Sequence, residues 1–291
     1  MNRKTLIEIK NVTKYFGKIR ILDNVSFKIP DRSVVGILGP NGSGKSTLMR
    51  IISGLIKSWE GDILFNDRSI KEDNSYLNKV GFLIEEPAFY EHLSAVRNLT
   101  ILSRLTNSPT NKIVDILKKV ELDDFSNKIV NEFSYGMKQR LGIAQAILND
   151  PNILFLDEPS NGLDPIGMVQ MNKTISKLNA QGKTICISTH VLEHVKDLCS
   201  HIIILKEGSL VLNDSIENLF SSTTKYEIKS TNIKSLKTNL SNLTDLNIID
   251  ETDRKLIIDS KLSFHELIQT LPENINIHSI NKEPNIQDLF L

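Results

Sequence analysis

A glycine-rich segment near the beginning of the chain has the residue types needed to hold phosphate groups. Gly39-x-x-x-x-Gly44-Lys45-Ser46 has the complete P-loop spacing. Glycines let backbone N–H groups turn inward around phosphates, and the helix that follows adds the positive end of its dipole. Lys45 would hold the β- and γ-phosphates, and the Ser46 hydroxyl would be a ligand of Mg²⁺. The residues predicted to contact a nucleotide are Gly39, Pro40, Asn41, Gly42, Ser43, Gly44, Lys45, Ser46 and Thr47.

Two adjacent carboxylates follow an apolar segment later in the chain. Ile153–Leu156 has the length of a buried strand, and Asp157 and Glu158 come directly after it. A carboxylate in this place is typical of a Mg²⁺ site, usually through water. A second acid beside it can orient and polarise an attacking water. We therefore assign Asp157 to the metal and Glu158 to general base catalysis, rather than interpreting them as two solvated acids.

A serine and a glycine mark a second candidate anion site, just before the helical pattern of Met137–Leu148. Ser134 is a favoured N-cap residue, and a helix N-terminus that contains Ser134 and Gly136 suits an anion. The P-loop already surrounds one side of a nucleotide. This second site therefore predicts a contact with the γ-phosphate held by another subunit.

The elements that must position these residues alternate between strands and helices. Short apolar runs at Ser33–Leu38, Ile153–Leu156 and Ile202–Leu205 have the length of buried strands, and residues 87–148 have a largely helical pattern. This alternation predicts a mostly parallel α/β core with an added helical lobe. The polar segment 221–225 then leads into further strand and helix patterns, which predict a small α/β appendage.

The composition is that of an ordinary globular protein. Of the 291 residues, 35 are Lys or Arg and 35 are Asp or Glu, so the formal net charge is zero. Nothing in this balance favours nucleic acid or an anionic membrane surface. No apolar run reaches the roughly 18–20 residues of a membrane span, and no export signal is recognisable. We expect a cytosolic protein in which Cys186 and Cys199 are buried, reduced thiols.

Over about residues 4–220 the chain resembles the nucleotide-binding subunits of ABC transporters. The segment Phe133–Arg140, FSYGMKQR, stands where that family has its LSGGQ-type signature. It retains the serine and the second glycine, whereas Tyr135 and Met137 depart from the pattern. The resemblance implies that this signature contacts a nucleotide across a dimer. Its residues are Ser134, Tyr135, Gly136 and Met137.

The resemblance also implies a domain organisation. An ATPase domain over residues 1–220 would have a P-loop NTPase (RecA-like) α/β core, a β-subdomain and a helical subdomain at about 87–150. Residues 221–291 would form the small C-terminal α/β appendage, whose role the resemblance leaves open. The implied cofactors are ATP and Mg²⁺. The implied partners are a membrane subunit on a separate chain and a second ATPase subunit, identical or related.

Further positions match the family's nucleotide contacts. Phe16 stands where the family stacks an aromatic ring on adenine, with the adjacent Tyr15 as the second candidate. His190 matches the family's switch histidine, whose imidazole can contact the γ-phosphate. The family's D-loop, which crosses the dimer interface, corresponds to Asn161, Gly162, Leu163 and Asp164.

A metal site built from the histidines near His190 is a competing interpretation. His190 closes one predicted strand and His201 begins another. His194 and Cys199 fall on the helix predicted between them. Because these side chains need not converge, we reject this metal site.

One departure from the family pattern points to a subfamily. Glu85 stands in place of the Q-loop glutamine, and its carboxylate can offer an oxygen to Mg²⁺ or its water. The segment Leu83–Leu99 resembles the ATPase subunits of bacitracin-resistance and lantibiotic-immunity exporters, in which a glutamate here is characteristic. The closing segment 283–291 resembles the end of many exporters of this group. The family's docking surface for a membrane-subunit helix corresponds to Pro87, Phe89, Tyr90, Leu93, Val96 and Leu99, which could also be core of the helical lobe.

These features predict the ATP-hydrolysing subunit of an ABC exporter, peripheral on the inner face of the cell membrane. The predicted cargo is a peptide antibiotic or a similar amphiphile. A soluble ABC-type ATPase that acts on nucleic acid or ribosomes is the alternative, but the chain has one P-loop and no basic stripe. A regulatory ATP sensor that barely hydrolyses is disfavoured by the pair Asp157 and Glu158.

Overall fold

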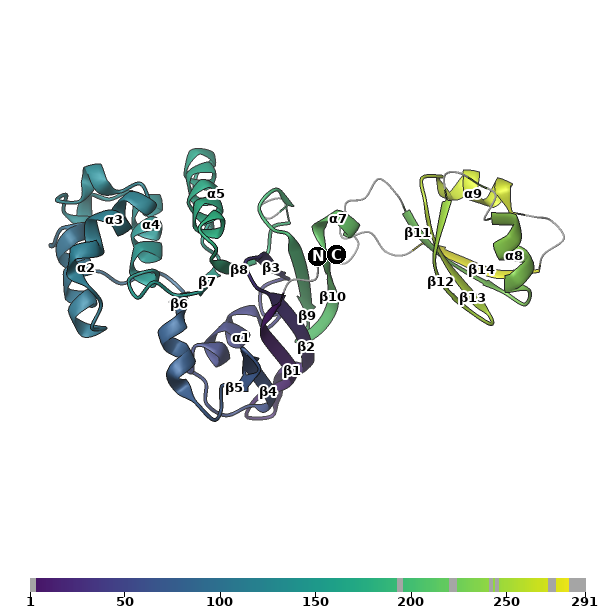
Figure 1. Ribbon diagram of the computed structural model, residues 1–291, viewed down its shortest axis with the longest axis horizontal. Helices are drawn as coiled ribbons and strands as arrows, with labels where there is room; N and C mark the ends of the chain where they lie inside the picture. Colours follow the sequence, from purple (N-terminus) through teal and green to yellow (C-terminus); the bar gives the residue numbers. More distant parts are fainter. Residues whose placement is uncertain are drawn as a thin grey trace. The chain divides into compact units, whose positions relative to one another are not determined.

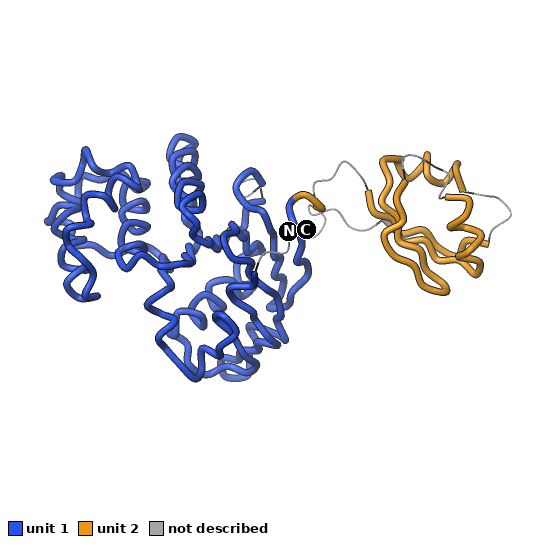
Figure 2. Tube along the Cα trace, viewed as in Figure 1, with its two compact units in different colours: residues 1–216 blue, residues 217–291 orange. Residues whose placement is uncertain are grey.

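The computed structural model describes residues 4–192, 196–219, 224–240, 243, 246–271 and 276–282. The chain divides into two compact units, unit 1 (residues 1–216) and unit 2 (residues 217–291), coloured differently in Figure 2. The domain boundary predicted at residue 220, the linker residues 221–223 and the closing segment 283–291 lie outside the described residues.

A six-stranded sheet forms the centre of unit 1. Its strands are β3 (Val34–Leu38), β6 (Val80–Leu83), β7 (Ile153–Asp157), β8 (Thr184–Thr189), β9 (His201–Lys206) and β10 (Ser209–Ser215). They lie in the order β10-β9-β3-β8-β7-β6, with β10 antiparallel to β9 and the others parallel. Every residue of β3, β7 and β8 is buried, as expected for parallel strands covered on both faces. The predicted, mostly parallel α/β core is confirmed.

A second, antiparallel sheet packs on the same hydrophobic core. Its strands are β1 (Thr5–Phe16), β2 (Ile19–Pro30), β4 (Glu60–Phe65) and β5 (Arg68–Ser69), in the order β2-β1-β4-β5. Helix α1 (Lys45–Ile52) buries Leu48, Met49 and Ile52 in this core. Each such side chain contributes about 1.5–3 kcal/mol by leaving water. The core thereby holds α1 at the end of β3.

A helical lobe is inserted between β6 and β7. The helices are α2 (Ala95–Leu105), α3 (Ile113–Lys119) and α4 (Tyr135–Ala146), which pack together beside α5 (Pro165–Ala180), as Figure 1 shows. Short 3-10 helices are η1 (Asn74–Lys79), η2 (Thr110–Lys112), η3 (Asp123–Phe125) and η4 (Val130–Glu132). Asn98, buried on α2, holds the backbone of Tyr90, accepting from its N–H at 2.8 Å and donating to its carbonyl at 3.0 Å. Leu99 is core of the lobe, whereas Tyr90 is 55% exposed.

Unit 2 has its own sheet and its own core. Its elements are β11 (Thr224–Ser230), α8 (Ile233–Leu240), β12 (Leu246–Thr252), β13 (Lys255–Ser260), α9 (Phe264–Thr270) and β14 (Ile277–Lys282), after the short helix α7 (Ile216–Leu219). The antiparallel order β12-β13-β11-β14 with two crossover helices is the ferredoxin-like, split βαβ arrangement. Tyr226, Leu236, Leu256 and Leu267 are among the side chains of its buried cluster.

We expect unit 2 to unfold as its own cooperative element. Leu236→Ala removes a fully buried side chain of its core and should destabilise this unit by about 2–5 kcal/mol. Lys234→Ala, at an exposed position on the same helix, is the matched control. Calorimetry of the full chain should show one shifted transition for Leu236→Ala. If every transition shifted by the same amount, the prediction that the two units unfold independently would be wrong.

Candidate active site

The predicted phosphate loop connects β3 to α1. Gly44 is the N-cap of α1 with φ of 101°. A Cβ added to Gly39 would lie 2.1 Å from the carbonyl oxygen of Leu205, so the approach of β9 to the loop requires glycine. The first N–H groups of α1 have no partner within the helix, so they are donors that an anion at this N-terminus could use.

Lys45 lies across the loop it follows. Its side chain is buried, and its Nζ donates to the carbonyl of Gly39 at 2.8 Å and to that of Pro40 at 3.1 Å. Glu158 Oε1 is 3.9 Å from the same Nζ. Burial lowers the pKa of Lys45, and the carboxylates of Glu158 and Asp157 oppose this shift. The lysine thus faces both the loop and the acid pair.

Ser188 on β8 sets the positions of both predicted acids. Asp157, the last residue of β7, is buried, and its Oδ1 accepts from the Ser188 hydroxyl. The backbone N–H of Glu158 donates to Ser188 Oγ at 2.9 Å. Glu158 itself has φ of 47°, so the chain turns sharply where it leaves the strand. No role was predicted for Ser188 from the sequence; the available signal was a polar residue opposite an acid near the ends of two buried strands.

His190 and Glu158 contact each other. The Nδ1 atom of His190 lies 3.1 Å from both carboxylate oxygens of Glu158. The side chain of His190 is 40% exposed and that of Glu158 is 23% exposed, so this pair lies at the surface while Lys45 lies below it. Lys45 and His190, which come from separate motifs, therefore meet at the carboxylate of Glu158.

The hydroxyl of Ser43 provides a test of whether the loop fits a triphosphate. Ser43 is 2% exposed, and its Oγ has no hydrogen-bond partner. A buried hydroxyl without a partner is costly, and a phosphate oxygen held by the loop would supply one. The donors of this loop are therefore consistent with a bound phosphate group.

The predicted Mg²⁺ site has only a small number of protein ligands. Among the described residues, no three His, Cys, Asp or Glu side chains cluster as a metal site. Ser46 and Asp157 instead follow the pattern of Mg²⁺, which is commonly held by one or two protein oxygens together with phosphates and waters. His194, from the rejected metal interpretation, lies outside the described residues, and burial raises the pKa of the Cys199 thiol to about 12.

Glu85 has a partner that was not predicted from the sequence. It follows β6 with φ of 64°, is exposed, and accepts from the guanidinium of Arg50 on α1. Exposed ion pairs are typically worth only about 0.2–1 kcal/mol, so this contact can exchange easily. Glu85 is thereby attached to the helix that begins at the phosphate loop.

The signature and the D-loop of the same chain lie against each other. Ser134 caps α4, accepting from the N–H of Met137 at 3.3 Å. A Cβ added to Gly136 would lie 3.3 Å from Leu163, and one added to Gly162 would lie 3.4 Å from the Tyr135 ring. Asp164 caps α5 and ends the D-loop, and Asn161 stands at its beginning. In the described part of the chain, no hydrogen bond or ion pair joins the signature to the phosphate loop.

The two aromatic candidates lie at the turn between β1 and β2. Phe16 is 49% exposed and Tyr15 is 44% exposed, and the Nζ of Lys14 lies 4.8 Å from the centre of the Phe16 ring. Strand β2 passes close to the phosphate loop, because a Cβ on Gly44 would lie 2.6 Å from Leu22. The beginning of β2, which follows these exposed rings, thus contacts the phosphate loop.

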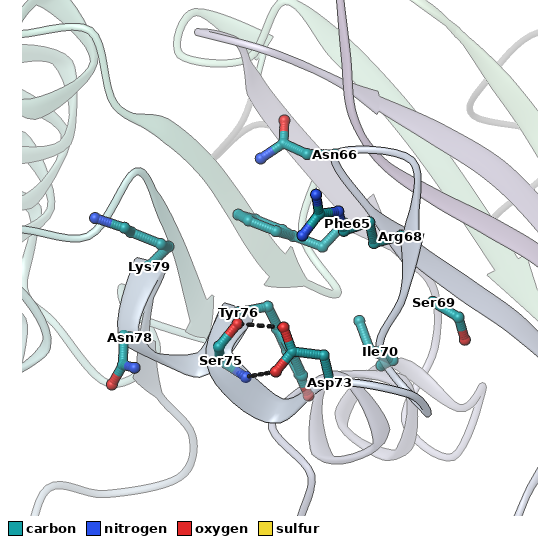
Figure 3. A pocket seen from close by; sticks show the side chains of 10 residues that line it. All are labelled: Phe65, Asn66, Arg68, Ser69, Ile70, Asp73, Ser75, Tyr76, Asn78 and Lys79. Atoms are coloured by element: carbon teal, nitrogen blue, oxygen red, sulfur yellow. Dashed lines mark hydrogen bonds between the residues drawn. The ribbon is translucent and has the colours of Figure 1, made fainter.

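A hollow of about 530 Å³ lies elsewhere in unit 1 (Figure 3). It is lined by Phe65, Asn66, Arg68, Ser69, Ile70, Asp73, Ser75, Tyr76, Asn78 and Lys79, none of which is a predicted site residue. Asp73 is occupied as the cap of η1, accepting from the N–H of Ser75 at 2.7 Å.

Comparisons with known proteins show the family of this chain. The family model described as ABC transporter matches residues 22–161. The lantibiotic transport ATP-binding protein SrtF of Streptococcus pyogenes is 39% identical, with 76% of this chain and 99% of SrtF covered. The bacitracin transport ATP-binding protein BcrA of Enterococcus faecalis is 35% identical, with 98% of this chain and 95% of BcrA covered. This chain belongs to the ABC transporter family.

Solved structures place the fold in the same family. A dimeric ATP-binding cassette in a post-hydrolysis state, bound to ADP and Pi, matches with a TM-score of 0.63 and 30% identity, covering 72% of this chain and 98% of that one. The predicted P-loop NTPase fold and the prediction of an ABC ATPase subunit are confirmed. The described residues of this ATPase contain no helix of the length and apolarity that a membrane crossing requires.

The Ser188 hydroxyl should be needed for turnover. Ser188→Ala leaves Asp157 buried without its donor and removes the hydroxyl acceptor of the Glu158 N–H, which keeps only the Ser188 carbonyl at 3.2 Å; we expect ATP hydrolysis to fall about tenfold. Ser200→Ala removes a hydroxyl that bonds the Val34 carbonyl outside the site and serves as the control. Phosphate release should fall for Ser188→Ala alone; equal rates for both variants would contradict this role.

Proposed function

We propose that this chain is the ATPase subunit of an exporter, in which two copies, or this chain and a related one, close on two molecules of ATP·Mg²⁺. The observation that carries the proposal is the convergence of Lys45, Glu158 and His190 at the carboxyl ends of adjacent parallel strands. This edge is where open α/β sheets bind their ligands.

Hydrolysis would proceed with the residues in separate roles. The loop N–H groups and Lys45 would hold the phosphates, with Lys45 exchanging its two carbonyl partners for phosphate oxygens. Glu158 would orient and deprotonate the attacking water, and His190 would hold the Glu158 carboxylate and contact the γ-phosphate. Phe16, or Tyr15 beside it, would stack on adenine.

Mg²⁺ would be held by the Ser46 hydroxyl and by Asp157, which Ser188 orients. Glu85 would add a further oxygen, directly or through water. This requires Glu85 to leave Arg50, an exchange that the exposure of both side chains makes inexpensive.

The dimer is supported by where the signature lies. Ser134–Met137 packs against its own D-loop and presents the N-terminus of α4, which suits a phosphate belonging to another chain. A relative of 30% identity forms a dimer bound to ADP and Pi. In the proposed dimer, Ser134 and Gly136 contact the γ-phosphate held by the partner, and Asn161–Asp164 crosses the interface.

The membrane partner and the cargo follow from exposure and from the relatives. Tyr90 is exposed beside the Glu85 loop and its backbone is fixed by Asn98, which makes a firm surface for a helix of a membrane subunit. The names of SrtF and BcrA refer to lantibiotic and bacitracin transport. We therefore propose a peripheral position on the inner face of the membrane and a peptide antibiotic, or a similar amphiphile, as cargo.

Glu158→Gln should separate binding from hydrolysis. The amide retains the shape of the side chain but cannot accept the proton of water, so we expect phosphate release to fall about 10²- to 10⁴-fold. ATP binding should persist, and ATP should drive dimerisation detectable by light scattering. Glu72→Gln, at an exposed acid outside the site, is the control. Continued turnover of Glu158→Gln would remove Glu158 from this role.

Glu85→Gln should change the Mg²⁺ dependence of the reaction. The variant loses one negative charge near the proposed metal, so half-saturating Mg²⁺ should rise severalfold while ATP binding without metal stays unchanged. With its membrane partner, the variant should also protect cells less well against a peptide antibiotic. Unchanged Mg²⁺ titrations together with unchanged protection would make Glu85 a bystander.

A further inference from the structure

Tyr135 lies where three loops of the ATPase meet. Its hydroxyl is 3.5 Å from Oε1 of Glu86, the residue after Glu85. Its ring lies over Gly162 of the D-loop, and its own backbone begins α4 in the signature. Tyr135 is therefore a residue of the signature whose side chain contacts both the acidic loop, Glu85–Glu86, and the D-loop.

Gln139 determines which way the Tyr135 hydroxyl donates. Gln139 lies one turn further along α4, is 4% exposed, and its Nε2 donates to the Tyr135 oxygen at 3.0 Å. A phenol has a single proton. Because its oxygen already accepts from Gln139, that proton is available for the Glu86 carboxylate. The contact with Glu86 is long, and because an ionised carboxylate can only accept, the Tyr135 hydroxyl is its donor.

The loop formed by Glu85 and Glu86 also contacts α1, the helix that begins at the phosphate loop. Arg50 of α1 pairs with Glu85, and Glu86 is the next residue. A continuous series of contacts thus runs from α1 through Glu85 and Glu86 to Tyr135. It joins the nucleotide site of this chain to the signature, which the proposed function directs at the nucleotide of the partner.

We propose that Tyr135 is a positioning residue through which the Glu85–Glu86 loop sets the orientation of the signature helix. Binding of ATP·Mg²⁺ to this chain draws Glu85 from Arg50, and Tyr135 transmits that displacement to Ser134 and Gly136. This inference rests on the proposed function. It explains why the Tyr135 hydroxyl contacts both Glu86 and Gln139. Packing of the ring on Gly162 would not require these two contacts.

The test removes the hydroxyl and keeps the ring. Tyr135→Phe should lower kcat for ATP hydrolysis by the full chain about threefold to tenfold, while KM for ATP stays within about twofold, because the ground-state contacts of the nucleotide are untouched. Glu86→Ala should have a similar effect. Glu86→Gln, which retains an acceptor oxygen, should restore most of the activity.

The double variant shows whether the two residues act together. If Tyr135 acts through Glu86, Tyr135→Phe with Glu86→Ala should be no slower than either single variant. Multiplying effects, or an unchanged kcat for Tyr135→Phe, would overturn the proposal. Tyr76→Phe is the matched control, since its hydroxyl donates to the Ile52 carbonyl at 2.7 Å in the core, and it should lower thermal stability without lowering kcat.

Failure of this inference differs from failure of the proposed function. If the wild-type chain hydrolyses ATP and Glu158→Gln dimerises with ATP, the proposed function stands, and an unchanged Tyr135→Phe rejects the Tyr135 contact alone. If Glu158→Gln stays monomeric with ATP even with its membrane partner, the proposed function fails first.

Discussion

The hydrogen bonds of one hydroxyl, that of Ser188, hold the acid pair on which the site depends. A hydroxyl has one proton and two lone pairs, so Ser188 donates to Asp157 and accepts from the N–H of Glu158 at once. Parallel pairing of β7 with β8 places Asp157 opposite Ser188. Asp157 therefore stays buried in line with its strand, whereas Glu158 turns toward Lys45 and His190. Two chemically similar acids acquire different positions from a single neighbour.

The parallel sheet brings motifs that are far apart in the sequence together into one site. The phosphate loop, the acid pair and His190 follow β3, β7 and β8, and these strands are neighbours in the sheet. Their carboxyl ends share an edge, so residues more than a hundred positions apart come within a few ångströms. The buried strands and α1 supply an apolar base, and the burial of Lys45 and Asp157 strengthens the electrostatic contacts that these two residues make.

Departures from the family pattern gather at the acidic loop and the signature. Glu85 pairs with Arg50, and Tyr135 contacts both Glu86 and Gly162. The tyrosine adds bulk where the family has a small residue, and Gly162 is the neighbour that makes room for it. Unit 2 has a hydrophobic core of its own and a split βαβ fold. None of the predicted catalytic residues lies in it.

The phosphate loop, the order of strands and helices, and the family could all be predicted from the residues alone, because these features depend on local spacing and on the burial pattern of parallel strands. It identified Asp157, Glu158 and His190 as separate motifs. The folded chain was needed to find that Ser188 contacts both acids, that Glu85 pairs with Arg50 and that Tyr135 faces Glu86. Such contacts join segments far apart in the chain, and their partners are set by strand order and helix packing, which no local spacing encodes.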